Sequence, residues 1–541
     1  MTICRLSFYR AASLIHKPHR RLFTTTQRND SKPYYITTPI FYPNAVPHIG
    51  HLYSLVIADI FARYQRLLNP GTPVQFLAGT DEHGLKIQKA AQLKGIPPLN
   101  FCDQLSEQFR NLSTAAHITH DRFMRTTSDT HHRAVEHIWN KLNDRGLIYK
   151  GKYSGWYSIT DECFYTENQI GPSSQDPNVM VSLETGAQVE WSNEENYMFR
   201  LSNFRSPLHS HYSAHRSIFP SQHHTHILDI LSEPLEDLSI SRPRSRLHWG
   251  LQVPNDPSQT VYVWFDALLV YLSGLGYPWH GGGTGEAEGW PVNLQLIGKD
   301  ILRFHAIYLP AILKALDLPL QERILAHAHW TVEQKKMSKS LGNVADPFEA
   351  IDEFGLDVVR YYLARVGGHF KDDVDWSRSQ LDKHSKELKS LLGNFLLRIA
   401  SPKIQARIIN QSSAHTSPSS APLLEAAHQL VDLVEASLER LDLSDALEHI
   451  TELLRLANKT ITDVAPWKPS CPPEDVMACY IASVETLRVA GICLQPFVPD
   501  TSKRLLDALA IPASERTWGF ARKKYGGHSP RFSAVDAVKL F

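Results

Sequence analysis

The sequence predicts an α/β protein in which a parallel-sheet domain is split by an insertion and followed by an α-helical bundle. Three observations support this prediction. A strand, helix, strand pattern occupies residues 34–80, the pattern breaks into short aromatic runs between 151 and 250, and long amphipathic segments dominate after about residue 375. The chain has 541 residues, of which 43% are hydrophobic. It is therefore long enough for several domains of about 100–200 residues each.

The first 29 residues have the composition of a mitochondrial transit segment. They contain six lysines or arginines, no acidic residue, and many Ser, Thr and aliphatic residues. A disordered basic tail is the alternative. We predict a transit segment over residues 1–32 and a location in the mitochondrial matrix.

The charge balance, cysteine content and distribution of apolar residues argue against several classes of protein without excluding a nucleic-acid partner. Lys plus Arg and Asp plus Glu are equal at 56 each, so a nucleic-acid surface must come from local clusters such as Arg242, Arg244 and Arg246. The six cysteines include no CxxC pair, which argues against a zinc ribbon or a disulfide framework. No run of about 18 apolar residues is free of charge or proline, so we expect no membrane span.

The first element of the sheet domain is a parallel strand, helix, strand unit. YYITTPIFY (34–42) and PVQFLAGT (73–80) resemble buried strands, and HLYSLVIADIFARYQRLL between them has helical spacing of its apolar residues. Such a crossover is right-handed, and its ligand crevice lies at the carboxyl ends of the strands. We assign residues 33–150 to the first half of this domain and 251–330, where strands return, to the second half.

The insertion, residues 151–250, contains a stretch with six histidines between 209 and 226. Such a density suggests metal binding. Because no acidic residue or cysteine stands at ligand spacing, a solvated helix and loop is favoured, and metal binding stays open.

Two histidines follow the first predicted strand. Pro47 suits the first turn of a helix, so His48 and His51 lie on one face of that turn, where the helix dipole and free N–H groups favour an anion. Gly50 between them allows a ligand to approach the backbone. Local chemistry favours a phosphate site over metal ligands or core histidines without deciding the matter.

A second cationic segment is KKMSKSLGN, residues 335–343. Its three lysines suit a loop that neutralises a polyphosphate, although most lysine clusters are solvated surface loops. HIGH at 48–51 and KMSKS at 336–340 are together the signatures of class I aminoacyl-tRNA synthetases. Within that class the chain resembles the methionyl-tRNA synthetases of mitochondrial type, from about residue 34 to its end. The resemblance rests on PIFYPNAVPHIGH, AGTDEHGLKIQ, YVWFDALLVYL, IGKDILRFHAIYLPAIL, KKMSKSLGN, NFLLR and NKTITDVAPW.

The resemblance implies a split Rossmann-like catalytic domain, a connective-peptide insertion, a KMSKS loop and stem-contact region at 331–385, and a helical anticodon-binding domain at 386–541. Many members of the family carry zinc knuckles in the insertion, but here Cys163 stands alone, so we predict an insertion without a zinc knuckle. It also implies a monomer that forms methionyl adenylate from methionine and ATP with Mg²⁺, and then transfers methionine to tRNA(Met). In the family pattern the catalytic residues are His48, His51, Lys336 and Lys339, and ATP also meets Gly50, Met337, Ser338 and Ser340.

Further site residues follow from the resemblance. Asp81 matches the acid that receives the methionine ammonium, although a helix N-cap would explain it too. Aromatic rings suit a thioether, yet Trp264 could equally be core. The methionine-binding positions are Ile40, Tyr42, Asp81, Trp264, Ala267, Tyr271 and His305, and the anticodon-binding positions are Asn394, Arg398 and Trp467. For the last three the alternatives are an exposed helix face and a core tryptophan.

Two rival interpretations remain. One is another class I synthetase, such as the enzyme for leucine or cysteine. The other is an inactive RNA-binding paralogue, against which the intact histidines, lysines and Asp81 argue. An insertion of roughly a hundred residues is too short for the hydrolytic editing domain that the leucine, isoleucine and valine enzymes need to reject near-identical amino acids.

Overall fold

The fold is described from a computed structural model of the chain. The structure describes residues 32–159, 163–165, 167–173, 176–183, 185–279, 283–337, 343–408, 417–524 and 535–541. All of the predicted transit segment except its last residue, Lys32, lies outside the described residues, and so do Ser338, Lys339, Ser340 and the side chain of Lys336.

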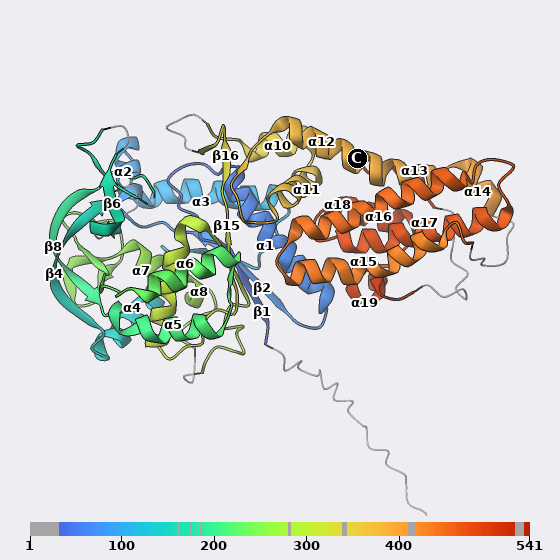
Figure 1. The fold of residues 1–541 in the computed structure, drawn as a ribbon. Coiled ribbons are helices and arrows are strands. Elements are labelled where there is room, and N and C mark those ends of the chain that lie inside the picture. Colours follow the sequence, from blue (N-terminus) through green and yellow to red (C-terminus); the bar gives the residue numbers. More distant parts are fainter. Residues whose placement is uncertain are drawn as a thin grey trace, which may run out of the picture. The chain divides into compact units, whose positions relative to one another are not determined.

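A six-stranded parallel sheet forms the centre of the N-terminal part of the chain, which confirms the predicted fold class (Figure 1). Its order is β3-β2-β1-β14-β15-β9. The strand order reverses between β1 and β14, so the carboxyl ends of these two strands form the crevice where such sheets bind ligands. The strands are β1 (Tyr34–Thr37), β2 (Val74–Thr80), β3 (Arg122–Arg125), β9 (Ile218–Phe219), β14 (Leu294–Gly298) and β15 (Ile324–His327).

Burial of both faces of the sheet explains the continuous apolar runs of its strands. Successive residues point to opposite faces, so Ile36 and Leu296 lie in one hydrophobic cluster while Tyr35 and Ile297 lie in another. Helices cover these faces. They are α1 (Ile49–Leu68), α2 (Leu85–Lys94), α3 (Pro98–Ala115), α4 (Asp129–Asp144), α7 (Val263–Leu268), α8 (Val270–Ser273) and α9 (Leu309–Ala315).

Antiparallel strands occupy much of the stretch between residues 151 and 250. The long strands β4 (Ile148–Ser158) and β8 (Glu190–Phe199) pair with each other, and β5 (Cys163–Tyr165) and β10 (Leu238–Ser239) complete their sheet. The same stretch also returns to the central sheet, because β9 pairs with β15. Its other elements are β6 (Ile170–Pro172), β7 (Met180–Ser182), α5 (Arg205–Ala214), α6 (Ser221–Ser232) and β11 (Ser241–Pro243), followed by β12 (Gln252–Val253) and β13 (Asp256–Val261).

A small sheet lies between the parallel-sheet part and the helices that follow it in the sequence. It contains β16 (Trp330–Val332), β17 (Lys335–Lys336) and β18 (Val374–Asp375). Two helices, α10 (Pro347–Phe354) and α11 (Leu356–Gly367), lie between β17 and β18 in the sequence.

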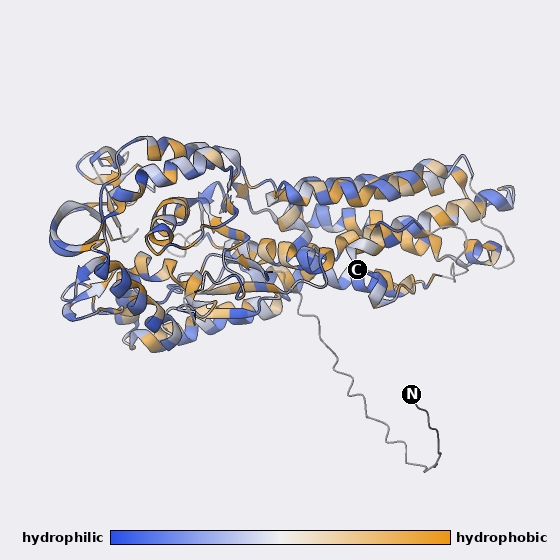
Figure 2. Cartoon of the chain, turned by 90° about the horizontal axis from the view of Figure 1, so that it is seen from below, coloured by the Kyte–Doolittle hydropathy of each residue, from blue (hydrophilic) through white to orange (hydrophobic). Residues whose placement is uncertain are grey.

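The C-terminal part is a helical bundle. Hydrophobic and hydrophilic residues alternate along its helices, as expected where one face of each packs on the others (Figure 2). Helix α17 is apolar and long enough to cross a membrane, but 94% of its apolar window is buried, as in the core helix of a bundle. The helices are α12 (Arg378–Leu388), α13 (Asn394–Ile399), α14 (Pro402–Ile408), α15 (Ala421–Glu439), α16 (Leu443–Val464), α17 (Pro473–Leu494), α18 (Pro499–Ala508) and α19 (Trp518–Ala521).

Candidate active site

His48 and His51 form the start of α1. His48 is the N-cap residue, whose Nδ1 accepts a hydrogen bond from the Gly50 backbone N–H at 3.0 Å, and His51 Nδ1 accepts one from the His48 N–H at 3.0 Å. Because both Nδ1 atoms are acceptors, the neutral rings carry their protons on Nε2. Each imidazole therefore caps the helix with one nitrogen and keeps an N–H donor on the other.

The two rings lie against each other, with centroids 3.9 Å apart. Burial, reinforced by His48, holds the pKa of His51 well below its usual range, so His51 is neutral at physiological pH. A Cβ added to Gly50 would lie 2.9 Å from His48 Cε1, so the glycine leaves room for the capping ring as well as for a ligand. The turn thus presents neutral N–H donors at the positive end of a helix, as an anion site requires.

The residues around the KMSKS segment connect it to the same helix. Lys336 ends β17 and pairs with Thr331 of β16. Met337 is buried in the hydrophobic cluster that also contains Ile49. After the segment, the carbonyl of Ala345 accepts a hydrogen bond from the N–H of Ile49 at 3.1 Å. The chain therefore leaves the lysine-rich segment beside the first turn of α1.

Four of the predicted methionine-binding residues come together. Tyr271 Oη lies 2.8 Å from His305 Nε2, and His305 Nδ1 lies 2.9 Å from the carbonyl of Ile301. The carbonyl can only accept, so Nδ1 carries the proton and the phenol donates to Nε2. Burial lowers the pKa of His305 to about 4. Burial and the nearby Asp81 carboxylate raise the pKa of the Tyr271 phenol, which also forms a hydrogen bond with the backbone of Ile40.

The remaining members of the predicted set lie on adjoining elements. Ala267 is buried on α7, and the Trp264 indole of the same helix stacks on Phe304, with ring centroids 3.9 Å apart. The Tyr42 hydroxyl donates to the carbonyl of His83 at 2.8 Å. Phe304 was not among the predicted residues. It opens a π-helical turn, Phe304–Tyr308 (η5), and such turns are frequent at functional sites.

A carboxylate shared by two histidines was not among the predicted residues either. Asp266 accepts from His83 Nδ1 at 2.6 Å and from His131 Nε2 at 2.7 Å, and His131 Nδ1 lies 2.8 Å from Ser273 Oγ. Asp266 and His131 are buried, and burial alone would raise the pKa of Asp266, but the two histidines hold it well below its usual range. The available signal was an acid in the otherwise apolar segment VWFDALLVYL.

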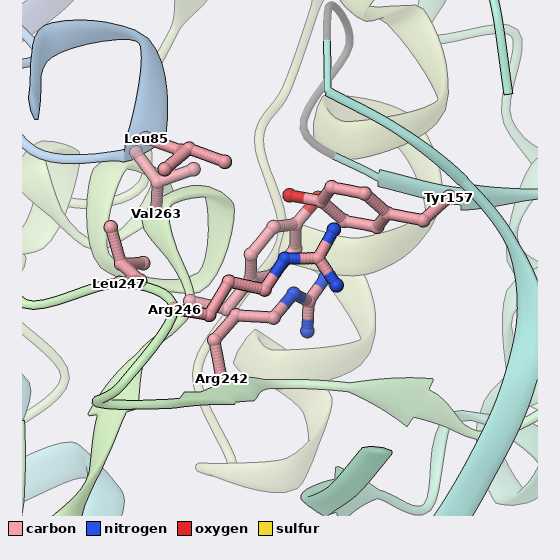
Figure 3. A pocket seen from close by; sticks show the side chains of 7 residues that line it. Leu85, Tyr157, Arg242, Arg246, Leu247 and Val263 are labelled. Atoms are coloured by element: carbon pink, nitrogen blue, oxygen red, sulfur yellow. The ribbon is translucent and has the colours of Figure 1, made fainter. Parts of the chain in front are cut away.

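A small cavity lined by two arginines lies beside this region (Figure 3). Arg242 is only 2% exposed, so it cannot belong to the surface cluster suggested by the sequence. Its guanidinium lies over the ring of Tyr262 at 4.3 Å and donates to the carbonyl of Ser241 at 2.7 Å. Arg246 lies over the ring of Tyr157 at 4.2 Å. The lining residues are Leu85, Tyr157, Arg242, Arg246, Leu247, Tyr262 and Val263.

Two of the three predicted anticodon-binding residues contact each other in the helical part. The Arg398 guanidinium lies 5.5 Å from the centroid of the Trp467 ring, and Arg398 Nη2 donates to Thr462 Oγ1 at 2.9 Å. Asn394 is exposed at the start of α13, one turn before Arg398. This helix also follows a π-helical turn, Lys389–Gly393 (η7).

The described residues include no group of three or more His, Cys, Asp or Glu side chains that could hold a metal ion. The His-rich stretch 209–226 spans the end of α5, β9 and the start of α6. The insertion without zinc remains a prediction, since the side chain of Cys163 is outside the described part of the chain.

Comparisons with known proteins agree with the motifs. The family model of the class I tRNA synthetases (M) matches residues 34–400. A probable mitochondrial methionine–tRNA ligase of Neurospora crassa is 43% identical over 514 residues, which cover 91% of this chain and 82% of the relative. The mitochondrial methionine–tRNA ligase of Homo sapiens is 41% identical over 526 residues, covering 92% and 87%. The crystal structure of Mycobacterium tuberculosis methionyl-tRNA synthetase bound by methionyl-adenylate aligns with a TM-score of 0.85 at 34% identity, covering 94% of this chain and 100% of that one.

Proposed function

We infer that this chain, which belongs to the methionine type of the class I tRNA synthetases, joins methionine to tRNA at the carboxyl edge of its parallel sheet. It is a methionine–tRNA ligase of the mitochondrial type, and it uses ATP. The relatives and the solved structure confirm the methionine–tRNA ligase function predicted from the sequence. The roles of individual residues, the identity of the tRNA, the use of Mg²⁺ and the oligomeric state are proposals, argued below.

The reaction has two steps. A carboxylate oxygen of methionine attacks the α-phosphorus of ATP, the bond from that phosphorus to the oxygen bridging the α- and β-phosphates breaks, and pyrophosphate leaves. A hydroxyl of the terminal adenosine of tRNA(Met) then attacks the acyl carbon, and AMP leaves. Neither step needs a bond to the enzyme, so the protein acts by positioning and by stabilising charge. Mg²⁺ enters with ATP and supplies countercharge to its phosphates.

The phosphates of ATP bind at the first turn of α1. The capping bonds to Nδ1 support this role, since they place the ring protons of His48 and His51 on Nε2, the nitrogen that can donate to an anion. The low pKa of His51 keeps it a neutral donor. Lys336 and Lys339 supply positive charge from the KMSKS segment, and Ala345, five residues after that segment, is hydrogen-bonded to the same turn.

Methionine binds between Asp81 and the residues around Tyr271. The Asp81 carboxylate receives the ammonium group, and its electrostatic effect on the Tyr271 phenol supports a common site. His305 is neutral because its pKa is lowered to about 4, so the thioether meets polar but uncharged groups. The stacked rings of Trp264 and Phe304 provide polarizable aromatic surface of the kind that contacts sulfur favourably.

The helical part, residues 386–541, binds the anticodon of tRNA(Met). A tryptophan beside an arginine, with an exposed asparagine one helical turn away, can stack and read the bases of a single-stranded loop. Residues 33–150 and 251–330 then form the two halves of the catalytic domain, with the insertion between them and the stem-contact region at 331–385.

Mitochondrial location follows from the names of the relatives, and we propose the matrix as the compartment because of the basic, acid-free composition of the first 29 residues. A fusion of residues 1–32 to a reporter should direct it to the matrix, and a cytosolic reporter would refute this proposal. We also propose a monomer, which light scattering of the purified chain would test.

One observation carries the proposed site. The proposed phosphate site at the start of α1 follows β1, the proposed ammonium partner Asp81 follows β2, and these neighbouring parallel strands end at the same edge of the sheet. Methionine-dependent exchange of pyrophosphate into ATP tests it. Exchange with leucine or cysteine in place of methionine would indicate another class I synthetase. Normal tRNA binding without any exchange would indicate an inactive RNA-binding paralogue.

A further inference from the structure

A buried chain of hydrogen bonds joins four elements behind the methionine site. It runs from Ser273 of α8 through His131 of α4 and Asp266 of α7 to His83, in the turn after β2. Its three links measure 2.8, 2.7 and 2.6 Å. The four residues are each at most 4% exposed, so no solvent competes for these bonds.

The chain members stand next to the proposed methionine-binding residues in the sequence. His83 follows Asp81 by two positions, and Ser273 follows Tyr271 by two. Asp266 lies between Trp264 and Ala267 on α7. In addition, the carbonyl of His83 accepts the hydroxyl of Tyr42. This chain of hydrogen bonds thus connects the backbone segment that carries Asp81, the proposed partner of the methionine ammonium group, to the segments that form the walls of the proposed thioether pocket.

A buried charge cluster of this kind is not explained by stability alone. Replacing a buried ion pair by apolar residues of similar volume is often neutral or stabilising, whereas an unpaired buried charge is costly. What the cluster does provide is geometry, because each carboxylate oxygen accepts one N–H and so fixes the direction of one imidazole. Residues that orient a site through such bonds are typical supports of binding groups.

We propose that Asp266, through His83 and His131, is a positioning residue that sets the separation between the Asp81 carboxylate and the thioether pocket formed by α7 and α8. The proposal rests on the function inferred above. Asp266 does not touch the substrate. It determines how well methionine fits, so its loss should weaken methionine binding without changing the binding of ATP.

The two histidines allow a crossed test, because they use different nitrogens. The amide nitrogen of Asn reaches about as far as His Nδ1, and that of Gln about as far as His Nε2. His83→Asn and His131→Gln should therefore keep the bond to Asp266, whereas His83→Gln and His131→Asn should lose it. Pyrophosphate exchange is measured for each variant at varied methionine and varied ATP, with thermal unfolding as a check of folding.

We expect the two matching variants to keep the KM for methionine within about threefold and the two mismatched variants to raise it tenfold or more. The KM for ATP should stay within twofold in all four. Asp266→Asn should raise the KM for methionine by at least tenfold, with kcat at saturating methionine within about threefold. His384 of α12, a histidine that hydrogen-bonds Glu387 of the same helix, is the control, and both of its amide variants should leave the KM for methionine unchanged.

Two outcomes would overturn the proposal. In one, the KM for methionine depends only on side-chain size, so that Asn raises it more than Gln does at both His83 and His131, or less at both. In the other, the KM values for methionine and ATP rise together. Failure of the proposed function looks different, because the unaltered enzyme would then show no methionine-dependent exchange at all.

Discussion

Replacing His48 by Asn should separate the capping bond of this ring, which the structure shows, from the phosphate contact that we propose for it. Asn is a strong N-cap residue whose side-chain oxygen can accept the Gly50 N–H in place of His48 Nδ1, so the free energy of unfolding should change by less than about 0.5 kcal/mol. The variant has no counterpart of the Nε2–H donor. Losing one preorganised donor to a charged transition state costs about 3 to 4 kcal/mol, so the exchange rate should fall by about 10² to 10³.

The assay pairs methionine-dependent pyrophosphate exchange with thermal unfolding of the same preparations. Ser377→Ala is the control, because Ser377 caps α12 through the Gln380 N–H, and its loss should cost about 1 kcal/mol of stability without affecting exchange. The reasoning is refuted if His48→Asn exchanges at the unaltered rate. It is also refuted if His48→Asn loses activity and its thermal unfolding temperature falls as much as that of Ser377→Ala. The His48 ring would then matter only for the stability of the fold.

Four more changes test other parts of the molecule. Gly50→Ala places a Cβ within 2.9 Å of the capping ring, so exchange should fall at least tenfold, and an unchanged rate would contradict the proposed fit. Trp467→Ala should cost about 1 to 3 kcal/mol in aminoacylation of tRNA(Met) and leave pyrophosphate exchange unchanged, whereas equal losses in both assays would argue against anticodon stacking. Burial lowers the pKa of His305 to about 4, below its value of about 6.5 in an unfolded chain. The unfolded state therefore binds the proton first, and the free energy of unfolding should fall as the pH drops from about 6.5 towards 4, by up to about 1.4 kcal/mol per unit. Urea unfolding at pH 7 and pH 5 should show that the free energy of unfolding falls less between these pH values for His305→Asn than for the unaltered protein. An equal fall in both proteins would contradict this. Asp59→Ala leaves the buried Arg360 without its carboxylate and should lower the free energy of unfolding by about 3 to 5 kcal/mol, so a loss below about 1 kcal/mol would disprove the importance of that pair.

The sequence predicts the parts of the fold that follow from local patterns. The apolar runs 34–42 and 73–80 form neighbouring parallel strands because both faces of the sheet are buried. The long amphipathic segments after residue 375 form the helical bundle, since their period of apolar residues needs a partner face. For His48 and His51, by contrast, local chemistry only weakly favours a phosphate site, and the assignment to class I synthetases depends on their occurrence together with KMSKS.

Other features depend on partners that are distant in the chain, and no local pattern indicates them. The two-residue strand β9 joins the central sheet from within the predicted insertion only because β15, more than a hundred residues later, offers an open edge. Arg242 has the sequence context of a surface cluster, yet aromatic rings from other segments enclose it. Likewise, Asp266 and His131 are 135 positions apart, so their pairing emerges only in three dimensions.

Helix α1 explains how the proposed phosphate site and the helical bundle can share one rigid support. Asp59, near the middle of this buried helix, pairs with Arg360 of α11 at 2.8 Å, and Arg360 also donates to the carbonyls of Pro496 and Phe497 between α17 and α18. An acid at this depth is costly unless it is paired, so its presence is best explained by the connection it makes. At a rise of about 1.5 Å per residue, Asp59 lies roughly 16 Å along the helix from His48. An α-helix hardly changes length, so the helix whose first turn is the proposed ATP site also holds the bundle proposed to bind the tRNA at a constant distance from that site.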